Sequence, residues 1–328
     1  MGAQLRVYRS RIRSVQSTKK ITKAMELIAT SRIAKAQARM QAARPYADEL
    51  TRALAALGKN ASLQHPMLTG VENPARAGIL VITSDRGLAG GYSASAIKVA
   101  NELADELRAA GKEPVLYVIG RKGVGYYRFR HVALADSWTG FSEQPTFVDA
   151  RDATETLVGA LVATSDGESH GAPGLDELYV VYTRFESMVT QTPVAALVSP
   201  VRAAQNGAQT SAEAGQTEAG QTEDAQAEGG PTGMGPTPAY EFEPEPEQLL
   251  TALLPRYVSA RIFSALLDSA ASESAARQRA MKSASDNASD LITTYTRLAN
   301  QARQAEITQE ISEIVGGADA LAAAGSDQ

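Results

Sequence analysis

Residues 256–315 read RYVSARIFSALLDSAASESAARQRAMKSASDNASDLITTYTRLANQARQAEITQEISEIV, a run of 60 residues without glycine or proline. As one α-helix this run would extend about 90 Å at ~1.5 Å per residue, far longer than an ordinary helix of a globular domain. Apolar and small residues recur at spacings of three and four, as at Leu291, Tyr295 and Leu298. This pattern predicts a narrow face that packs against another helix. We therefore expect a long helix over 249–316, with a flexible tail over 317–328.

The other end of the chain supplies a partner for this helix. Residues 3–57 contain Pro45 as their only helix breaker, so they can form a helix of about 80 Å. Ile12, Val15, Ala29 and Ile33 belong to a narrow apolar seam with polar interruptions, which is typical of a coiled coil. Because the two helices come from opposite ends of the sequence, we expect residues 1–58 and 249–316 to form a long antiparallel coiled coil.

The middle of the chain, residues 70–202, has a different pattern. Short apolar runs suited to buried strands alternate with amphipathic segments suited to helices. The expected strands are 78–83, 114–120, 178–182 and 194–198, and the expected helices are 94–110 and 147–163. This alternation predicts an α/β domain with a parallel, Rossmann-like sheet.

Composition and charge narrow the classes of function. The chain has 328 residues, a net charge of −5 and no cysteine, which excludes disulfides, thiolate metal sites and thiol catalysis. Residues 1–58 carry 12 basic and 3 acidic groups, whereas residues 203–248 carry nine acidic groups and no basic one. A basic helix can meet nucleic acid, an anionic membrane or an acidic protein surface. Nucleic acid is disfavoured, because the basic helix lacks interleaved aromatic residues, and no apolar run is long enough to cross a bilayer.

Few residues suggest chemistry. The loop TSDRGLAGG at 83–91 follows a strand and opens a helix, which is where phosphates bind in α/β folds. It is neither a dinucleotide fingerprint nor a P-loop. The competing interpretation is a tight turn in which Asp85 or Arg86 fixes the loop or contacts a neighbour. The three histidines lack metal-ligand spacing, and no catalytic constellation is visible.

Six motifs resemble the γ subunit of F-type ATP synthases. They are RIRSVQSTKKITKAMELIA at 11–29, ARPY at 43–46, SDRGLAGG at 84–91, LLPRYV at 253–258, MKSASDN at 281–287 and ARQAEITQEISEIV at 302–315. The two C-terminal motifs are the most specific, and together the six bracket nearly the whole chain. The resemblance begins at about residue 2, which argues against a transit peptide and for a bacterial protein.

The resemblance implies a rotor that performs no chemistry itself. In this family the terminal helices form an antiparallel coiled coil inside a ring of three α and three β subunits, which bind Mg-ATP and Mg-ADP. The α/β domain forms a foot that touches the ε subunit and the c ring. Proton flow turns the c ring and γ together, and the asymmetric shaft drives each β subunit through its states. The expected place is the cytoplasmic face of the bacterial plasma membrane, with attachment only through the complex.

The resemblance also implies positions of contact, by matching motifs. Lys20, Lys23 and Met25 match the part of the N-terminal helix that faces an acidic lever on β. Near the end of the shaft, the positions that match hydrogen-bonding residues are Arg303, Gln304, Thr308 and Glu310. The positions that match the foot surface facing ε and the c ring are Tyr182, Arg184 and Phe185. Met25, Ile307 and Ile311 have an alternative role, which is to pack the coiled coil.

Two segments have no counterpart in the family pattern. Residues 165–175 read as a polar loop. Residues 203–238 are of low complexity, with few large apolar residues, and are expected to be a disordered acidic insertion. This insertion is either a regulatory element that slows rotation or a tolerated loop.

Two other classes of function stay open on the sequence. A free-standing α/β enzyme would bind a nucleotide near 85–91. A coiled-coil scaffold or chaperone would need helices that pair stably without a surrounding ring, whereas small residues and polar interruptions predict weak pairing.

Overall fold

The computed structural model describes residues 2–58, 65–163, 167–169, 172–201 and 246–325. The acidic insertion expected at 203–238 lies outside these residues, as do 165–166 and 170–171 of the expected polar loop. The described part of that loop forms two short antiparallel strands, β4 (Glu168–Ser169) and β5 (Ala172–Pro173).

Two helices dominate the chain, as predicted. Helix α1 spans Gly2–Gly58 and continues through Pro45, and helix α7 spans Pro246–Gly325 and continues through Pro255. Helix α7 is therefore longer than expected, and the tail predicted from residue 317 is helical up to Gly325. Gly316 and Gly317 cost roughly 1 kcal/mol each in a helix, whereas the alanines that follow them favour helix.

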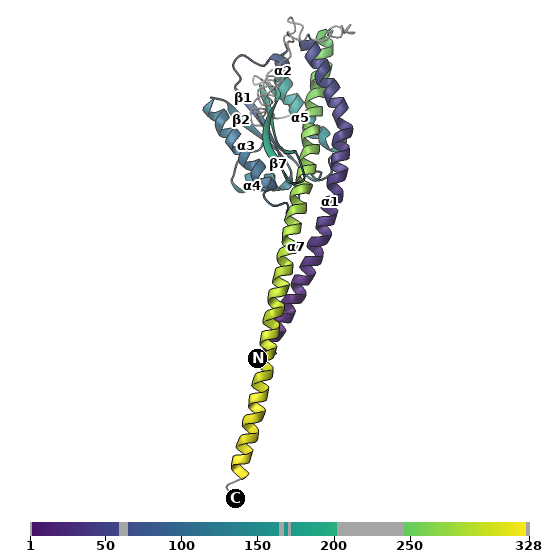
Figure 1. Cartoon of the computed structure of the whole chain (residues 1–328). Coiled ribbons are helices and arrows are strands. Elements are labelled where there is room, and N and C mark those ends of the chain that lie inside the picture. Colours follow the sequence, from purple (N-terminus) through teal and green to yellow (C-terminus); the bar gives the residue numbers. More distant parts are fainter. Residues whose placement is uncertain (1, 59–64, 164–166, 170–171, 202–245, 326–328) are drawn as a thin grey trace, which may run out of the picture. The chain divides into compact units, whose positions relative to one another are not determined.

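The chain divides into two compact units, and both long helices contribute to each. The first unit contains residues 1–31 and 277–328, and the second contains residues 32–276. In the first unit α1 and α7 run side by side and antiparallel (Figure 1). The rings of Tyr8 and Tyr295 lie 6.4 Å apart, and the Arg11 guanidinium lies 5.7 Å from the Tyr295 ring centroid. The expected pairing of the terminal helices is thus observed here.

The second unit is built around a five-stranded sheet of order β3-β2-β1-β6-β7 (Figure 1). Its strands are β1 (Arg76–Ile82), β2 (Glu113–Ile119), β3 (Asp136–Trp138), β6 (Glu177–Phe185) and β7 (Gln191–Ser199). The first four are mutually parallel. Strand β7 instead runs antiparallel to β6, because the five residues between them are too few for the crossover that a parallel pair needs.

Helices cover both faces of the sheet. One face holds α3 (Tyr92–Ala109) and α4 (Arg121–Phe129), with Ile79 and Val81 packed among their apolar residues. The other face packs Leu80 and Ile82 with α5 (Phe147–Ala163), the short α2 (Pro66–Thr69) and parts of α1 and α7. Burial on both faces explains why β1 is an uninterrupted apolar run. The fold class is therefore α/β with long terminal helices, as predicted.

Part of α7 resembles a membrane span by length and composition. A window within Gln248–Gly316 has a mean hydropathy of 1.2, and 44% of that window is buried inside the protein. Core helices of soluble proteins have the same properties. In α7 the buried residues that contribute to the domain core include Leu254, Val258, Ile262 and Leu266.

Candidate functional site

A basic groove lies on the first unit at the positions predicted to face a partner. It has a volume of about 800 Å³. Its lining residues are Gln16, Lys19, Lys20, Lys23, Ala24, Leu27 and Ile292. Lys20 and Lys23 are exposed, and Leu27 is exposed although it is apolar. Lysine side chains beside accessible apolar ones fit an acidic, partly apolar segment better than a small ligand.

The predicted contact residues of α1 differ in their exposure and in whether a described residue already pairs with them. Lys23 Nζ lies 3.0 Å from a carboxylate oxygen of Glu26, which sits one turn further along the helix. Lys20 takes part in none of the ion pairs seen among the described residues. Met25 is half-buried, so part of its side chain packs in the protein and part is accessible. Lys20 is therefore the cation best placed to meet an external carboxylate.

The end of α7 carries the second predicted set. It projects beyond the start of α1 (Figure 1), and Arg303, Gln304, Thr308 and Glu310 are all exposed. Ile307 and Ile311 are 45% and 56% exposed. The alternative in which these two isoleucines pack the coiled coil is therefore not observed. Apolar and polar side chains therefore lie together on a part of α7 that no other described helix covers.

The predicted foot residues lie on β6, in the β6–β7 hairpin. Tyr182 is only 9% exposed and belongs to the domain core. Its side chain is therefore turned inward, whereas Arg184 is exposed and Phe185 is half-buried. Successive side chains of a strand point to opposite faces, so Tyr182 and Arg184 share one face of β6. Burial on that face therefore ends between these two residues, toward the tip of the hairpin.

Sequence reasoning missed two apolar residues at the tip of this hairpin. Met188 and Val189 are exposed, Val189 by 76%. The sequence contains a signal for this, because Met188 and Val189 lie between Ser187 and Thr190. Two apolar residues in so short a polar stretch indicate an exposed turn and not a strand. Ser187 orders the turn: its N–H donates to Thr190 O at 3.0 Å, and its Oγ accepts the N–H of Thr190 at 2.9 Å.

A half-buried carboxyl group lies near the hairpin. Asp268 of α7 lies near the backbone N–H of Phe185, which favours the charged form of the carboxyl group. Burial raises the pKa of Asp268 to about 6, although Arg184, Arg261 and Arg44 act in the opposite direction. Desolvation thus outweighs the nearby positive charges.

The loop at 83–91 is held by its own aspartate. The Asp85 carboxylate accepts the backbone N–H groups of Arg121 (3.1 Å), Gly140 (2.8 Å) and Ser142 (3.0 Å). A carboxylate therefore occupies the start of α4, where a phosphate would otherwise find free N–H groups. Gly120 permits this close packing: its φ is +101°, and a Cβ there would lie 2.2 Å from Thr83 O.

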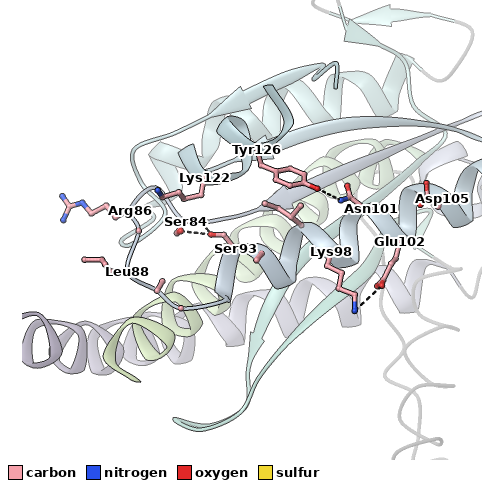
Figure 2. Close-up of a pocket in the computed structure, with 15 residues that line it drawn as sticks. Ser84, Arg86, Leu88, Ser93, Lys98, Asn101, Glu102, Asp105, Lys122 and Tyr126 are labelled. Carbon is pink, nitrogen blue, oxygen red and sulfur yellow. Dashed lines mark hydrogen bonds and ion pairs between the residues drawn. The ribbon is translucent and has the colours of Figure 1, made fainter. Parts of the chain in front are cut away.

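A cavity of about 610 Å³ opens beside this loop, between α3 and α4 (Figure 2). Ser84 and Ser93 bond to each other across 2.7 Å, and the Asn101 amide donates to Tyr126 Oη at 3.3 Å. The charged lining is mixed, because Lys98 lies 3.7 Å from Glu102. Polar groups that satisfy one another, with both signs of charge, do not select a phosphate chain. The geometry favours the tight-turn interpretation over a nucleotide site.

Glu143 joins this loop region to α1. Its carboxylate accepts a hydrogen bond from Arg32 of α1 and lies 3.5 Å from Arg86. The Glu143 side chain is mostly buried. Within the described ranges, no group of three or more histidine, aspartate or glutamate side chains is arranged to hold a metal ion.

Comparison with known proteins decides the family. A family model described as ATP synthase matches residues 4–321. The ATP synthase gamma chain of Salinispora arenicola is 56% identical over the full length of both chains. The ATP synthase gamma chain of Mycolicibacterium smegmatis is 52% identical over 98% of this chain and 99% of its own.

The chain belongs to the ATP synthase γ-chain family. It is therefore a subunit of an enzyme complex. Solved structures agree in fold: the rotor of Euglena gracilis mitochondrial ATP synthase has a TM-score of 0.60 at 14% identity, covering 94% of this chain and all of its own. The central stalk and c ring structure of Tetrahymena thermophila mitochondrial ATP synthase gives a TM-score of 0.52 at 21% identity, covering 81% and 99%.

Proposed function

We propose that this chain is the central-stalk rotor of the F1 part of a proton-driven ATP synthase. It couples rotation of the c ring to the conformational cycle of the catalytic β subunits. It performs no chemistry, and Mg-ATP and Mg-ADP bind to the partner α and β subunits. It lies at the cytoplasmic face of a bacterial plasma membrane and attaches to that membrane only through the complex.

The observation that carries this proposal is the exposed end of α7. Ile307, Ile311 and Ile314 are exposed on a helix that has no partner within the described part of the chain at that point. Exposed apolar residues on one helix end suit a surface that another protein covers. A ring of α and β subunits would cover it on all sides, with Arg303, Gln304, Thr308 and Glu310 as the polar contacts.

The basic groove at Lys20 and Lys23 gives the rotor its second proposed contact with a partner. A carboxylate-rich lever on β would meet Lys20 first, because Lys23 already has Glu26 beside it. Met25 adds partly accessible apolar surface on the same helix. Exposed ion pairs contribute only ~0–1 kcal/mol each. Such contacts guide a rotating shaft from one β subunit to the next without holding it.

The β6–β7 hairpin is the proposed foot contact with the c ring and the ε subunit. Arg184 and Phe185 provide accessible side chains, and Met188 and Val189 extend the apolar surface at the tip. Tyr182 supports the hairpin from the core instead of touching a partner.

Co-purification of a tagged chain from its native membranes tests the proposal. We expect the α, β and ε subunits to be recovered with the tagged chain, together with Mg-dependent ATPase activity that the isolated chain lacks. Recovery of the chain alone, or with unrelated proteins, would refute it. Nucleotide binding by the isolated chain would instead favour an enzyme.

A further inference from the structure

Strand β6 extends beyond the strand beside it. It pairs with β1 only as far as Val81 and Val181, whereas it pairs with β7 as far as Phe185 and Gln191. Residues 182–185 therefore have a strand on one side only. Alternate residues of a strand direct their N–H and C=O groups to the same side. The open edge thus belongs to Thr183 and Phe185, and buried backbone groups there need other partners.

Helix α7 supplies those partners from side chains. Ser272 Oγ donates to Thr183 O at 2.9 Å, and the Thr183 N–H donates to Ser269 Oγ at 3.4 Å. The carboxyl group of Asp268 lies near the backbone N–H of Phe185. Positions 268, 269 and 272 share one face of a helix. We call these three side chains the edge clamp.

The edge clamp is well placed to resist movement of the hairpin. Ser269, Ser272 and Thr183 are all buried, so water does not compete for these bonds. Apolar contacts tolerate sliding, because the hydrophobic effect has no direction. Hydrogen bonds weaken steeply when their angle changes, so the clamp fixes both the position and the orientation of the hairpin on α7.

We propose that Asp268, Ser269 and Ser272 are positioning residues that transmit force between the β6–β7 hairpin and helix α7. A force on the tip then reaches α7 instead of bending the hairpin away from it. Because the bonds go to backbone atoms of β6, they leave the side chains of Arg184 and Phe185 free for a partner. The inference rests on the proposed function, in which this hairpin meets the c ring.

A pair of matched serine variants in the complete synthase tests the proposal. Ser272→Ala removes a bond to β6. Ser274→Ala removes an equally buried hydroxyl that has no hydrogen-bond partner in the described structure. We expect Ser272→Ala, combined with Ser269→Ala, to lower proton-driven ATP synthesis about threefold or more, the scale of losing one or two hydrogen bonds. The ATPase of detached F1 carries no load from the c ring and should be unchanged, and Ser274→Ala should match wild type in both assays.

Variants of Asp268 separate the effect of a polar side chain near Phe185 from the effect of its charge. Asp268→Asn keeps an oxygen near the Phe185 N–H, whereas Asp268→Ala does not. We expect the asparagine variant to retain ATP synthesis and the alanine variant to lose it while the ATPase of detached F1 persists. Equal loss in both variants would assign the effect to charge and overturn the clamp.

Hydrogen exchange in the wild-type complex tests the same bonds without a mutation. The amide of Thr183 should exchange far more slowly than that of Met188 at the tip. Exchange as fast as at Met188 would overturn the proposal, as would ATP synthesis in the Ser269/Ser272 double variant equal to that of Ser274→Ala. A wild-type chain that fails to co-purify with α and β would refute the proposed function instead, and the amides of the purified chain would still test the clamp.

Discussion

Replacing Asp85 by alanine should destabilise the α/β domain strongly. The side chain is 8% exposed and accepts three backbone N–H groups, which come from the start of α4 and from the loop after β3. Hydrogen bonds to a charged group contribute about 1.5–3 kcal/mol each. Bonds that share one carboxylate are not additive, so we expect a loss of about 3 kcal/mol in the free energy of unfolding.

The chain carries its own probe for this loss. Trp138 is the only tryptophan, its ring stacks on Tyr117 with centroids 6.3 Å apart, and the segment held by Asp85 follows it directly. Urea unfolding can therefore be followed by its fluorescence. With a slope of ~2 kcal/mol per molar urea, the midpoint should fall by about 1.5 M.

A surface aspartate gives the control. Asp105 is 77% exposed, and among the described residues it pairs only with Arg108 of its own helix, at 2.7 Å. Asp105→Ala should change the free energy of unfolding by less than about 0.5 kcal/mol. Equal midpoints for Asp85→Ala and Asp105→Ala would refute the reasoning that Asp85 fixes the loop. Asp85→Asn should lie between them, because an amide offers one acceptor oxygen where the carboxylate offers two.

Three further predictions follow from the structure. Burial raises the pKa of Asp268 from its ordinary value of 3.8 to about 6, so between these values the folded state binds more protons than the unfolded state. The contribution of Asp268 to stability is therefore present below about pH 4 and lost as pH rises through 6, by at most about 3 kcal/mol. Asp268→Asn should flatten this part of the wild-type profile of stability against pH. Gly120→Ala should destabilise the domain by several kcal/mol in urea unfolding, because the new Cβ would overlap Thr83 O. Gly125→Ala is the control, because a Cβ there meets nothing within 4 Å. This control should be neutral or stabilising by up to ~1 kcal/mol. Reversing charge at Lys20 and Lys23 with glutamate should slow the ATPase of the assembled F1 most at low salt, and a rate independent of ionic strength would contradict the guiding role.

The predicted elements of the α/β domain were found where apolar patterning was strong. Helix α5 has the bounds predicted for it, 147–163. Helix α4 was missed because Gly123 and Gly125 lower its helix propensity. Gly123 is required there by packing, since a Cβ would lie 2.8 Å from Thr83 Oγ1. Strand β3 was missed because its three residues show no period.

The candidate contact residues also divide into positions whose exposure the sequence predicts and positions whose exposure it does not predict. Exposure at Lys20 and at Arg303 agrees with positions assigned by resemblance, because polar side chains on a long helix stay at the surface. Tyr182 was predicted as a contact residue together with Arg184 and Phe185, and it is buried in the domain core. A strand of unknown register gives no warning of this, because a shift of one residue exchanges the two faces.

The sequence by itself determined the two long helices, the α/β middle and the family. These features follow from local periodicity, from the absence of breakers over long runs, and from motifs that stand in one segment of chain each. Only the tertiary structure decided how Asp85 uses its carboxylate, which way Tyr182 faces, and that Ser272 bonds to Thr183. Asp85 and Gly140 are 55 positions apart, and Thr183 and Ser272 are 89 apart. Their contacts depend on where folding brings distant backbone atoms together, and no local pattern records that.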